Sequence, residues 1–292
     1  MYLSIIIPTL NEEKYLPKLL ESIKKQTFKD YEIIVADVGS KDKTVEIAKK
    51  YGCKIVKGGL PAQGRNNGAK HAQGELLLFL DADSILPTKF FLEKAIKEFN
   101  KRKLSVASCG FLPADKSVYL PHKVVVNYFR FIRFLMIALE NIFPFGIGAC
   151  IFAEKSFHNS IGGFAESIKL AEDNNYIKKA ASRGKYGVLR SVYFSTSVRR
   201  FDKEKWVRPF MLYLLAAFLV LDEEKLKLFN KGIFEYRYGN YNYYDIIKEK
   251  GLSLNAKNIT DKLAKKINYN KIKIKREISL IKNKIKKIIE KI

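Results

Sequence analysis

Short apolar runs of strand length alternate with helical patterns over the first 80 residues of this chain. The clearest runs are residues 3–7, residues 33–36 and Leu76–Leu80, all apolar or β-branched except Ser4. Between the first two runs, Leu16, Leu19, Leu20 and Ile23 fall at helical spacing, and the later helical segments, 44–51 and 65–73, are followed by Gly52 and Gly74. This alternation predicts an α/β fold with a mostly parallel sheet that is covered by helices on both faces.

Polar residues follow three of the predicted strands. They occupy residues 8–12, residues 37–40 and residues 81–83. In a parallel sheet the ligand binds beyond the carboxyl ends of the strands. We therefore expect these three polar clusters to meet at one rim and to form a binding site there.

Two aspartates, Asp81 and Asp83, come directly after the apolar strand. Alternate residues of an extended segment project to the same side, so the two carboxylates are expected to lie together. Such a pair suits a hard divalent cation that keeps waters and takes further ligands from phosphate groups. The alternative is that the two acids only cap the next turn.

Several motifs occur in a fixed order and resemble the family 2 glycosyltransferases of GT-A fold. The resemblance covers residues 1–201 and rests on the segments Ser4-Ile-Ile-Ile-Pro8-Thr-Leu-Asn11-Glu12, Val35-Ala-Asp37-Val-Gly39-Ser40-x-Asp42-x-Thr44, Gly64-Arg65-Asn66-x-Gly68, Phe79-Leu-Asp81-Ala-Asp83, and Gly162-Gly163-Phe164 followed by Glu172-Asp173. It implies an enzyme that transfers a sugar from a nucleotide-diphospho-sugar to an acceptor.

The resemblance also implies a set of donor-binding residues at the rim. They are Pro8, Thr9, Asn11, Glu12, Asp37, Gly39, Arg65 and Asp81. Asp37 is expected to bind the base, although the second acid that the family often has next to it is Val38 here. The alternative for Asp37 is a turn-forming role before Gly39. Arg65 is expected at the start of a helix over residues 65–73, where free N–H groups favour phosphate.

The resemblance assigns the chemistry to two further pairs of acids. Asp81 and Asp83 are expected to hold Mg²⁺ or Mn²⁺, and Asp173 resembles the family's general base. Glu172 is expected to position its neighbours or to bind acceptor hydroxyls, and its alternative is an acid favoured by the dipole at a helix start. A single displacement inverts the anomeric centre and needs no enzyme nucleophile.

The chain is expected to divide at residue 201. The first part is a catalytic domain with a nucleotide-sugar half (1–110) and an acceptor half (111–201), and residues 202–292 form a helical, basic C-terminal region. Residues 124–145 predict an amphipathic helix with Asn127, Arg130, Arg133 and Glu140 in one arc. This helix is expected to line a groove, to lie at an interface or to pack on the core. The apolar run 210–221 is too short to span a membrane and is expected to be buried or interfacial.

The chain is strongly basic, with 54 Lys and Arg residues against 30 Asp and Glu. Residues 261–292 contain 12 Lys and Arg but only 3 Asp and Glu. These charges surround a heptad-like isoleucine seam that starts at Ile274. That tail docks on the catalytic domain, pairs with another chain or lies on anionic lipid. Lysines alternate there with isoleucine rather than with stacking aromatics, which disfavours nucleic acid. We expect a cytoplasmic enzyme, peripheral on the inner face of the membrane, with a lipid-linked acceptor. Arg199 and Arg200 are candidates to grip a diphosphate or a lipid phosphate.

Other residue patterns exclude several classes of protein. The three cysteines are widely spaced and odd in number, so no disulfide framework or zinc site is expected, and no secretion signal is evident. His71, His122 and His158 show no metal-ligand spacing. The Gln-x-x-Arg-Trp motif of processive synthases is absent. The competing function is a non-catalytic, basic binding protein on the same scaffold for anionic lipid or nucleic acid.

Overall fold

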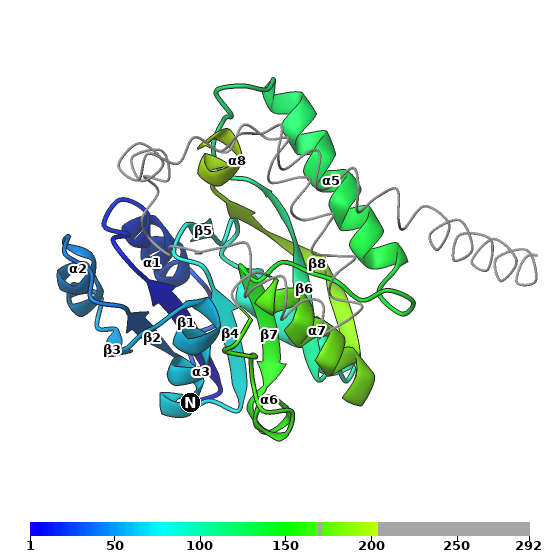
Figure 1. Cartoon of the computed structure of the whole chain (residues 1–292), viewed down its shortest axis with the longest axis horizontal. Helices are drawn as coiled ribbons and strands as arrows, with labels where there is room; N and C mark the ends of the chain where they lie inside the picture. The colour runs from blue at the N-terminus through cyan, green and yellow to red at the C-terminus, as the bar shows by residue number, and fades with distance from the viewer. Residues whose placement is uncertain (169–170, 204–292) are drawn as a thin grey trace, which may run out of the picture. The chain divides into compact units, whose positions relative to one another are not determined.

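The computed structural model describes residues 1–168 and 171–203. The described part contains an eight-stranded mixed sheet in the order β3-β2-β1-β4-β7-β6-β8-β5 (Figure 1). The strands are β1 (Leu3–Thr9), β2 (Tyr31–Asp37), β3 (Lys54–Lys57), β4 (Leu76–Leu80), β5 (Ser84–Ile85), β6 (Val106–Pro113), β7 (Cys150–Glu154) and β8 (Tyr186–Thr196). The helices are α1 (Leu16–Lys24), α2 (Thr44–Lys50), α3 (Pro61–His71), α4 (Phe91–Lys101), α5 (His122–Ala138), α6 (Lys155–Ser160), α7 (Glu172–Arg183) and α8 (Arg199–Lys203).

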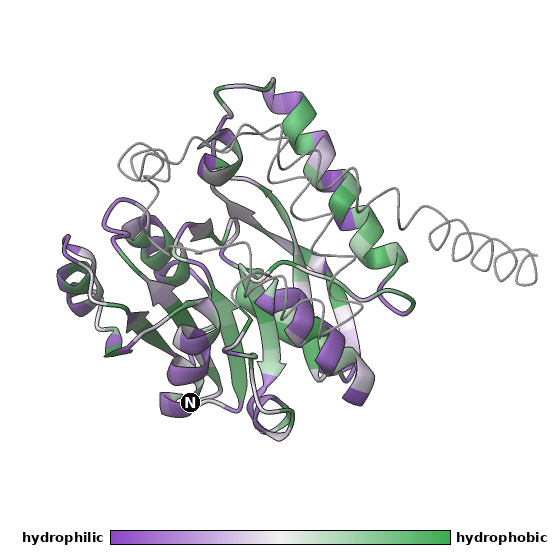
Figure 2. Ribbon diagram, viewed as in Figure 1, coloured by the Kyte–Doolittle hydropathy of each residue, from purple (hydrophilic) through white to green (hydrophobic). Residues whose placement is uncertain are grey.

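The predicted α/β class is confirmed, and the parallel part of the sheet is the part that the apolar runs indicated. β3, β2, β1 and β4 are parallel neighbours, whereas β7 pairs antiparallel with both β4 and β6. Every residue of β1 and β4 is buried, so both faces of the central strands are covered. Figure 2 shows β4 as apolar and the helices α3 and α7 as largely hydrophilic.

Helix α3 lies close against β1 because it has no side chains at two positions one turn apart. A Cβ at Gly68 would collide with Ile6, and one at Gly64 would come within 3.2 Å of the Pro8 Cβ. The glycines of the Gly-Arg-Asn-x-Gly motif therefore allow close packing of the helix on the sheet. Because Pro8 faces this helix, its ring belongs to the interface of β1 and α3.

The first strand and the first helix differ from the predicted bounds. β1 continues through Pro8 to Thr9, which the sheet tolerates because β1 pairs with β4 only as far as Ile6. The sequence Asn11-Glu12-Glu13 is typical of a helix start, but Asn11 adopts a left-handed φ of 55° and helix α1 begins only at Leu16.

Two later helices also differ from prediction. α3 begins at Pro61, since proline favours the first helical position, and this places Arg65 inside the helix and away from free N–H groups. α5 spans His122–Ala138 rather than 124–145, and it packs on β6 and β8. Glu140 lies beyond its end and is buried, with Arg102 and Arg190 as partners at 3.1 and 2.7 Å, so it is not part of a polar helix face.

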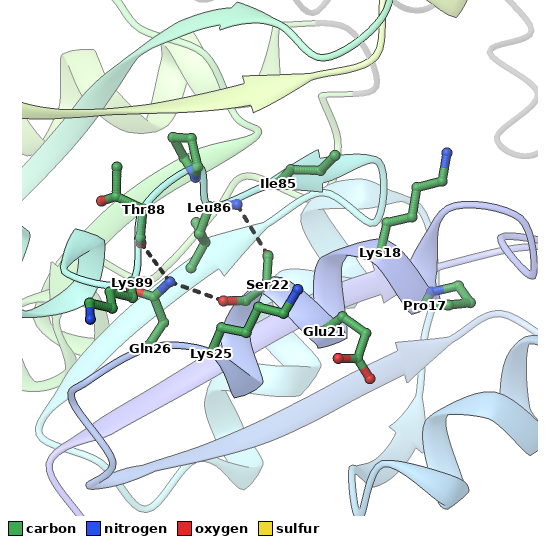
Figure 3. Close-up of a pocket in the computed structure, with 11 residues that line it drawn as sticks. Pro17, Lys18, Glu21, Ser22, Lys25, Gln26, Ile85, Leu86, Thr88 and Lys89 are labelled. Atoms are coloured by element: carbon green, nitrogen blue, oxygen red, sulfur yellow. Dashed lines mark hydrogen bonds between the residues drawn. The ribbon is translucent and has the colours of Figure 1, made fainter.

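The segment that follows Asp83 is anchored on α1. Ser22 Oγ accepts the Leu86 N–H, and Gln26 Nε2 donates to the carbonyls of Ser22 and Thr88 (Figure 3). An open groove of about 520 Å³ lies along this contact, with Lys18 and Lys25 on one side and Lys89 on the other. These hydrogen bonds fix the chain directly after the two aspartates.

The expected C-terminal region lies almost entirely outside the described residues. That applies to the apolar run 210–221, to the isoleucine seam and to the lysine-rich tail 261–292. Within the described residues, no helix combines the length and the apolar character that crossing a bilayer requires.

Candidate active site

The carboxyl ends of β1, β2 and β4 lie side by side. β1 and β2 run in parallel register, so Thr9 stands opposite Asp37, and Asp81 directly follows β4. Thr9 Oγ1 donates to Asp37 Oδ1 at 2.9 Å. The three polar clusters therefore meet along one edge of the sheet, as expected from the strand order.

The Asp37 carboxylate is held by the turn that follows it. The N–H groups of Gly39 and Ser40 both donate to Oδ2 at 2.8 Å, and Ser40 Oγ donates to Oδ1 at 2.5 Å. Gly39 has a φ of 96°, a conformation that favours glycine. With Thr9, these donors engage both oxygens, so the turn-forming role considered for Asp37 is the one seen here.

The loops after β1 and β2 are joined by hydrogen bonds. The Asn11 N–H donates to Ser40 Oγ, and Asn11 Oδ1 accepts the Lys41 N–H, both at 2.9 Å. The Glu12 N–H donates to Thr44 Oγ1 at 2.7 Å. Main-chain groups of the donor-site candidates are thus held in place by hydrogen bonds within the protein.

Arg65 connects the two halves of the site. Its side chain is 3% exposed, and it pairs with Asp81 at 2.8 Å through Nη2 and with Glu172 at 2.9 Å through Nη1. The next residue, Asn66, exchanges two hydrogen bonds of 2.9 Å with the main chain of Phe164. Two motifs that lie about a hundred residues apart in sequence are therefore in direct contact.

Asp173 lies at the start of α7 beside a glycine. Its Oδ2 accepts the Gly148 N–H and its Oδ1 accepts the Asn174 N–H, both at 2.7 Å. A Cβ at Gly148 would stand 2.9 Å from the Asp173 Cβ and 3.1 Å from Arg65 Nη2. Glycine is required here because the loop passes between the aspartate and the arginine.

Asp83 has an arginine partner of its own. Arg199, the first residue of α8, places Nε 3.1 Å from Asp83 Oδ2 and also binds both oxygens of Glu12, at 2.7 and 3.1 Å. Its guanidinium lies over the Tyr15 ring, 4.2 Å from the centroid. A residue near the end of the predicted catalytic domain is thus part of the rim.

The rim holds more negative than positive charge. Burial raises the pKa of Asp83 to about 7 and that of Glu172 to about 7, in each case against an arginine partner and with help from neighbouring acids. Burial likewise raises the pKa of Glu12 and of Asp173. Burial disfavours the charged form of Arg65, but the neighbouring carboxylates of Asp81 and Glu172 outweigh burial and raise the pKa of this arginine. Because burial and like charges disfavour the ionised form of these carboxyls, an additional cation at the rim would be bound favourably.

The sequence model described as "Glycosyl transferase family 2" matches residues 4–162, more than half of the chain. The chain belongs to glycosyl transferase family 2. The matched segment contains the first four motifs and Gly162, and it ends before Glu172 and Asp173.

Two relatives show how far the similarity extends. The "Uncharacterized glycosyltransferase EpsJ" of Bacillus subtilis (strain 168) is 28% identical over 187 residues, which cover 59% of this chain and 54% of EpsJ. "Dolichyl-phosphate beta-glucosyltransferase ALG5A" of Trichomonas vaginalis (strain ATCC PRA-98 / G3) is 38% identical over 119 residues, which cover 35% of this chain and 37% of ALG5A. The chain thus spans about half the length, or less, of these relatives.

Two solved structures have the same fold. TarS 1–349 of S. aureus in complex with UDP-GlcNAc matches with a TM-score of 0.53 and 25% identity, over 68% of this chain and 58% of that one. The mannosyltransferase PcManGT from Pyrobaculum calidifontis, in complex with GDP-Man and Mn²⁺, gives a TM-score of 0.55 at 21% identity, over 78% and 72%. The predicted GT-A fold of the family is confirmed.

The acids of this family 2 chain fit a divalent cation that also binds phosphate. Among the described residues, no three His, Cys, Asp or Glu side chains converge as a metal cluster. Asp81 and Asp83 offer two hard oxygen donors, and the Asp81 side chain is 41% exposed. Two carboxylates on an accessible rim suit a metal whose other ligands are waters and diphosphate oxygens.

Sequence reasoning missed four contacts of the family 2 site. It assigned Arg65 to phosphate, whereas the side chain joins Asp81 to Glu172. It gave no role to Gly148 or Tyr15, and only their neighbours in space reveal one. Arg199 was singled out by its position after the last strand, but its pairing with Asp83 had no sequence signal.

Histidines and cysteines take no part in the site. His158 is buried and its Nδ1 lies 3.0 Å from the Tyr176 hydroxyl, while His71 and His122 are exposed. All three cysteines are buried and free, as expected from their spacing. The expectation of structural or surface histidines is therefore confirmed.

Proposed function

We propose that this protein transfers a sugar from a nucleotide-diphospho-sugar to an acceptor hydroxyl or phosphate with inversion at the anomeric carbon. The observation that carries this proposal is the bridge of Arg65 between Asp81 and Glu172, next to Asp173. It brings the acids at the donor end of the sheet next to the acids that begin α7. Family membership and the fold shared with sugar-nucleotide complexes support the same function.

The nucleoside end of the donor is assigned to the loops after β1 and β2. Thr9, Asn11, Glu12 and Gly39 present main-chain and side-chain polar groups there, with Pro8 beneath them. Asp37 positions the loop that faces the base, because its carboxylate holds the turn at Gly39 and Ser40. For a direct hydrogen bond from the base to Asp37, a base N–H has to replace one of the two bonds that Ser40 donates to this carboxylate. The joined loops support a preformed nucleoside platform.

We assign Asp81 and Asp83 to a Mg²⁺ or Mn²⁺ ion. When bound, such an ion supplies positive charge to the diphosphate as it leaves. PcManGT, which shares the fold, was solved with GDP-Man and Mn²⁺, and this supports the assignment. Arg65 stabilises the charge of Asp81 from the protein side.

Asp173 is assigned as the general base, and Glu172 as a positioning residue. The acceptor oxygen attacks the anomeric carbon, its proton moves to the Asp173 carboxylate, and the bond between that carbon and the phosphate oxygen breaks. The departing diphosphate keeps the electron pair. Glu172 is held by Arg65 at 2.9 Å, so its carboxylate is engaged in orienting the start of α7. Asp173 accepts only N–H bonds and retains lone pairs for a proton.

The acceptor is assigned to a lipid-linked phosphate or glycolipid at an anionic membrane. Exposed apolar side chains follow α5 and its flanks, where Figure 2 shows apolar and polar residues in alternation: Val118, Tyr119, Val124, Phe131, Phe134 and Ile142. Lys123 and Arg130 are exposed on the same helix. Apolar insertion combined with positive charge holds proteins reversibly at anionic bilayers. ALG5A, which acts on dolichyl phosphate by its name, is a relative over part of the chain.

Calorimetry with UDP and GDP in the presence and absence of Mn²⁺ tests the donor site. Asp83→Ala should abolish metal-dependent binding of the nucleotide, while Asp30→Ala, at an exposed acid outside the site, should bind like the wild type. Undiminished metal-dependent binding in Asp83→Ala would sink the metal assignment. Absence of any nucleotide binding would favour the non-catalytic alternative.

Vesicle flotation tests the membrane assignment. The full chain should float with anionic but not with neutral vesicles, and salt should weaken the association. Phe131→Ser combined with Phe134→Ser should reduce flotation, because these side chains are 56% and 63% exposed on α5. Phe90→Ser, at an exposed phenylalanine before α4, is the matched control. A double variant that floats as well as the control excludes α5 as the contact.

A further inference from the structure

Arg199 occupies the carboxylate that the proposed function assigns to a metal ion. Its Nε lies 3.1 Å from Asp83 Oδ2, while its two terminal nitrogens bind the two oxygens of Glu12. The Asp83 and Glu12 side chains are only 16% and 10% exposed. One guanidinium therefore pairs with two acids at a little-exposed part of the rim.

The main chain around Arg199 is built to hold it there. The Arg199 N–H donates to Ser197 Oγ at 3.2 Å, and Ser197 Oγ donates in turn to Asp115 at 2.7 Å. The Ser197 N–H also reaches the carbonyl of Asp83 at 3.3 Å. The chain that carries the arginine is thus tied to the segment that carries its acidic partner.

The contacts of Arg199 conflict with cation binding at Asp83. A divalent ion on Asp83 would share a low-exposure site with a permanent positive charge, and like charges at contact distance repel strongly. The guanidinium is also the group best suited to bind phosphate oxygens in a bidentate manner. The diphosphate that accompanies the metal offers the arginine a replacement partner.

We propose that Arg199 is a displaceable internal cation: it holds Asp83 and Glu12 while the donor site is empty, and it must leave Asp83 before a divalent ion can bind there. The inference rests on the proposed function, because it takes Asp83 as a ligand of the metal. Metal binding in the absence of nucleotide should therefore be weak. Arg199 gives up its contact with the Asp83 carboxylate when the metal binds, and only the diphosphate of the nucleotide offers it a new partner.

Titration of the full chain with Mn²⁺ in the absence of nucleotide tests this switch, with free Mn²⁺ measured by electron paramagnetic resonance. Arg199→Met should bind Mn²⁺ at least about tenfold more tightly than the wild type, because a close charge pair no longer competes. Arg183→Met removes the same charge at an exposed arginine at the end of α7 and should stay within about threefold of the wild type. Arg199→Lys, which keeps the charge but cannot span both acids, should lie between the two methionine variants.

The outcomes separate the switch from the proposed function. If the wild type binds Mn²⁺ with UDP or GDP but Arg199→Met behaves like Arg183→Met, the switch is overturned and the donor site stands. If none of the proteins shows metal-dependent nucleotide binding, both are overturned.

Discussion

Lowering the pH should destabilise the protein through His158, which is buried between strand and helix. Its side chain packs against Phe79 and Phe164, with ring centroids 5.4 and 5.9 Å away, and meets the Tyr176 hydroxyl. Burial, and then the positive charge of Lys179, lower the pKa of His158 from 6.5 to about 4. The folded protein therefore keeps this imidazole neutral at pH values at which the unfolded chain protonates it.

The sign and size of the effect follow from proton linkage. Between pH 6.5 and 4 the unfolded state binds more protons at this site, so the free energy of unfolding falls as the pH falls. A drop from pH 7 to pH 4.5 should remove about 2 to 3 kcal/mol through this one group. Asp83 and Glu172, with pKa values of about 7, bind their protons in the folded state first and act in the opposite direction. The effect must therefore be measured as a difference between proteins.

Urea unfolding followed by circular dichroism at pH 7 and pH 4.5 isolates the His158 contribution. The wild type should lose its stability advantage over His158→Gln on going to the lower pH, by the amount given above. His71→Gln, the same change at an exposed position, should follow the wild type at both values. Parallel pH profiles for the wild type and His158→Gln would show that burial does not hold this histidine neutral.

Three further substitutions probe the acidic rim. Asp173→Asn should leave donor binding nearly intact and lower sugar transfer by roughly 10² to 10⁴, as expected for a general base; the opposite result, with loss only in Glu172→Gln, reverses the two roles. Gly148→Ala should cost about 1 to 3 kcal/mol in urea unfolding, because its Cβ meets Asp173 and Arg65. Arg65→Met should cost about 3 to 5 kcal/mol by leaving two acids unpaired, and a neutral result contradicts the buried bridge.

The first part of the fold, through β4, could be read from the sequence because its signals are local. Continuous apolar runs mark buried parallel strands, and the residue after each run falls at the carboxyl edge, which placed Asp37 and Asp81 correctly. The antiparallel insertion of β7 could not be read in the same way. It pairs Cys150–Glu154 with Leu76–Leu80, and nothing in either segment specifies a partner so distant in sequence.

The partners of charged side chains were the least predictable part of the site. Motif membership placed Arg65 and Asp173 near the rim, but the direction of each side chain depends on the tertiary contacts of α3 and α7. Arg65 was expected at a helix end and lies inside the helix because Pro61 starts it earlier. Glu140 was expected on a helix surface and became a buried partner of Arg102 and Arg190.

The bridge made by Arg65 also limits how far the chain can be shortened from its C-terminal side. The family match ends at residue 162, yet Glu172 lies ten residues beyond it, and β8, which follows later still, pairs in the sheet with β6 and β5. A fragment trimmed to the matched segment would expose a strand edge and leave a guanidinium, 3% exposed in the intact chain, without one of its two carboxylates. Such a fragment should collect in inclusion bodies, whereas expression of the full chain should yield folded material.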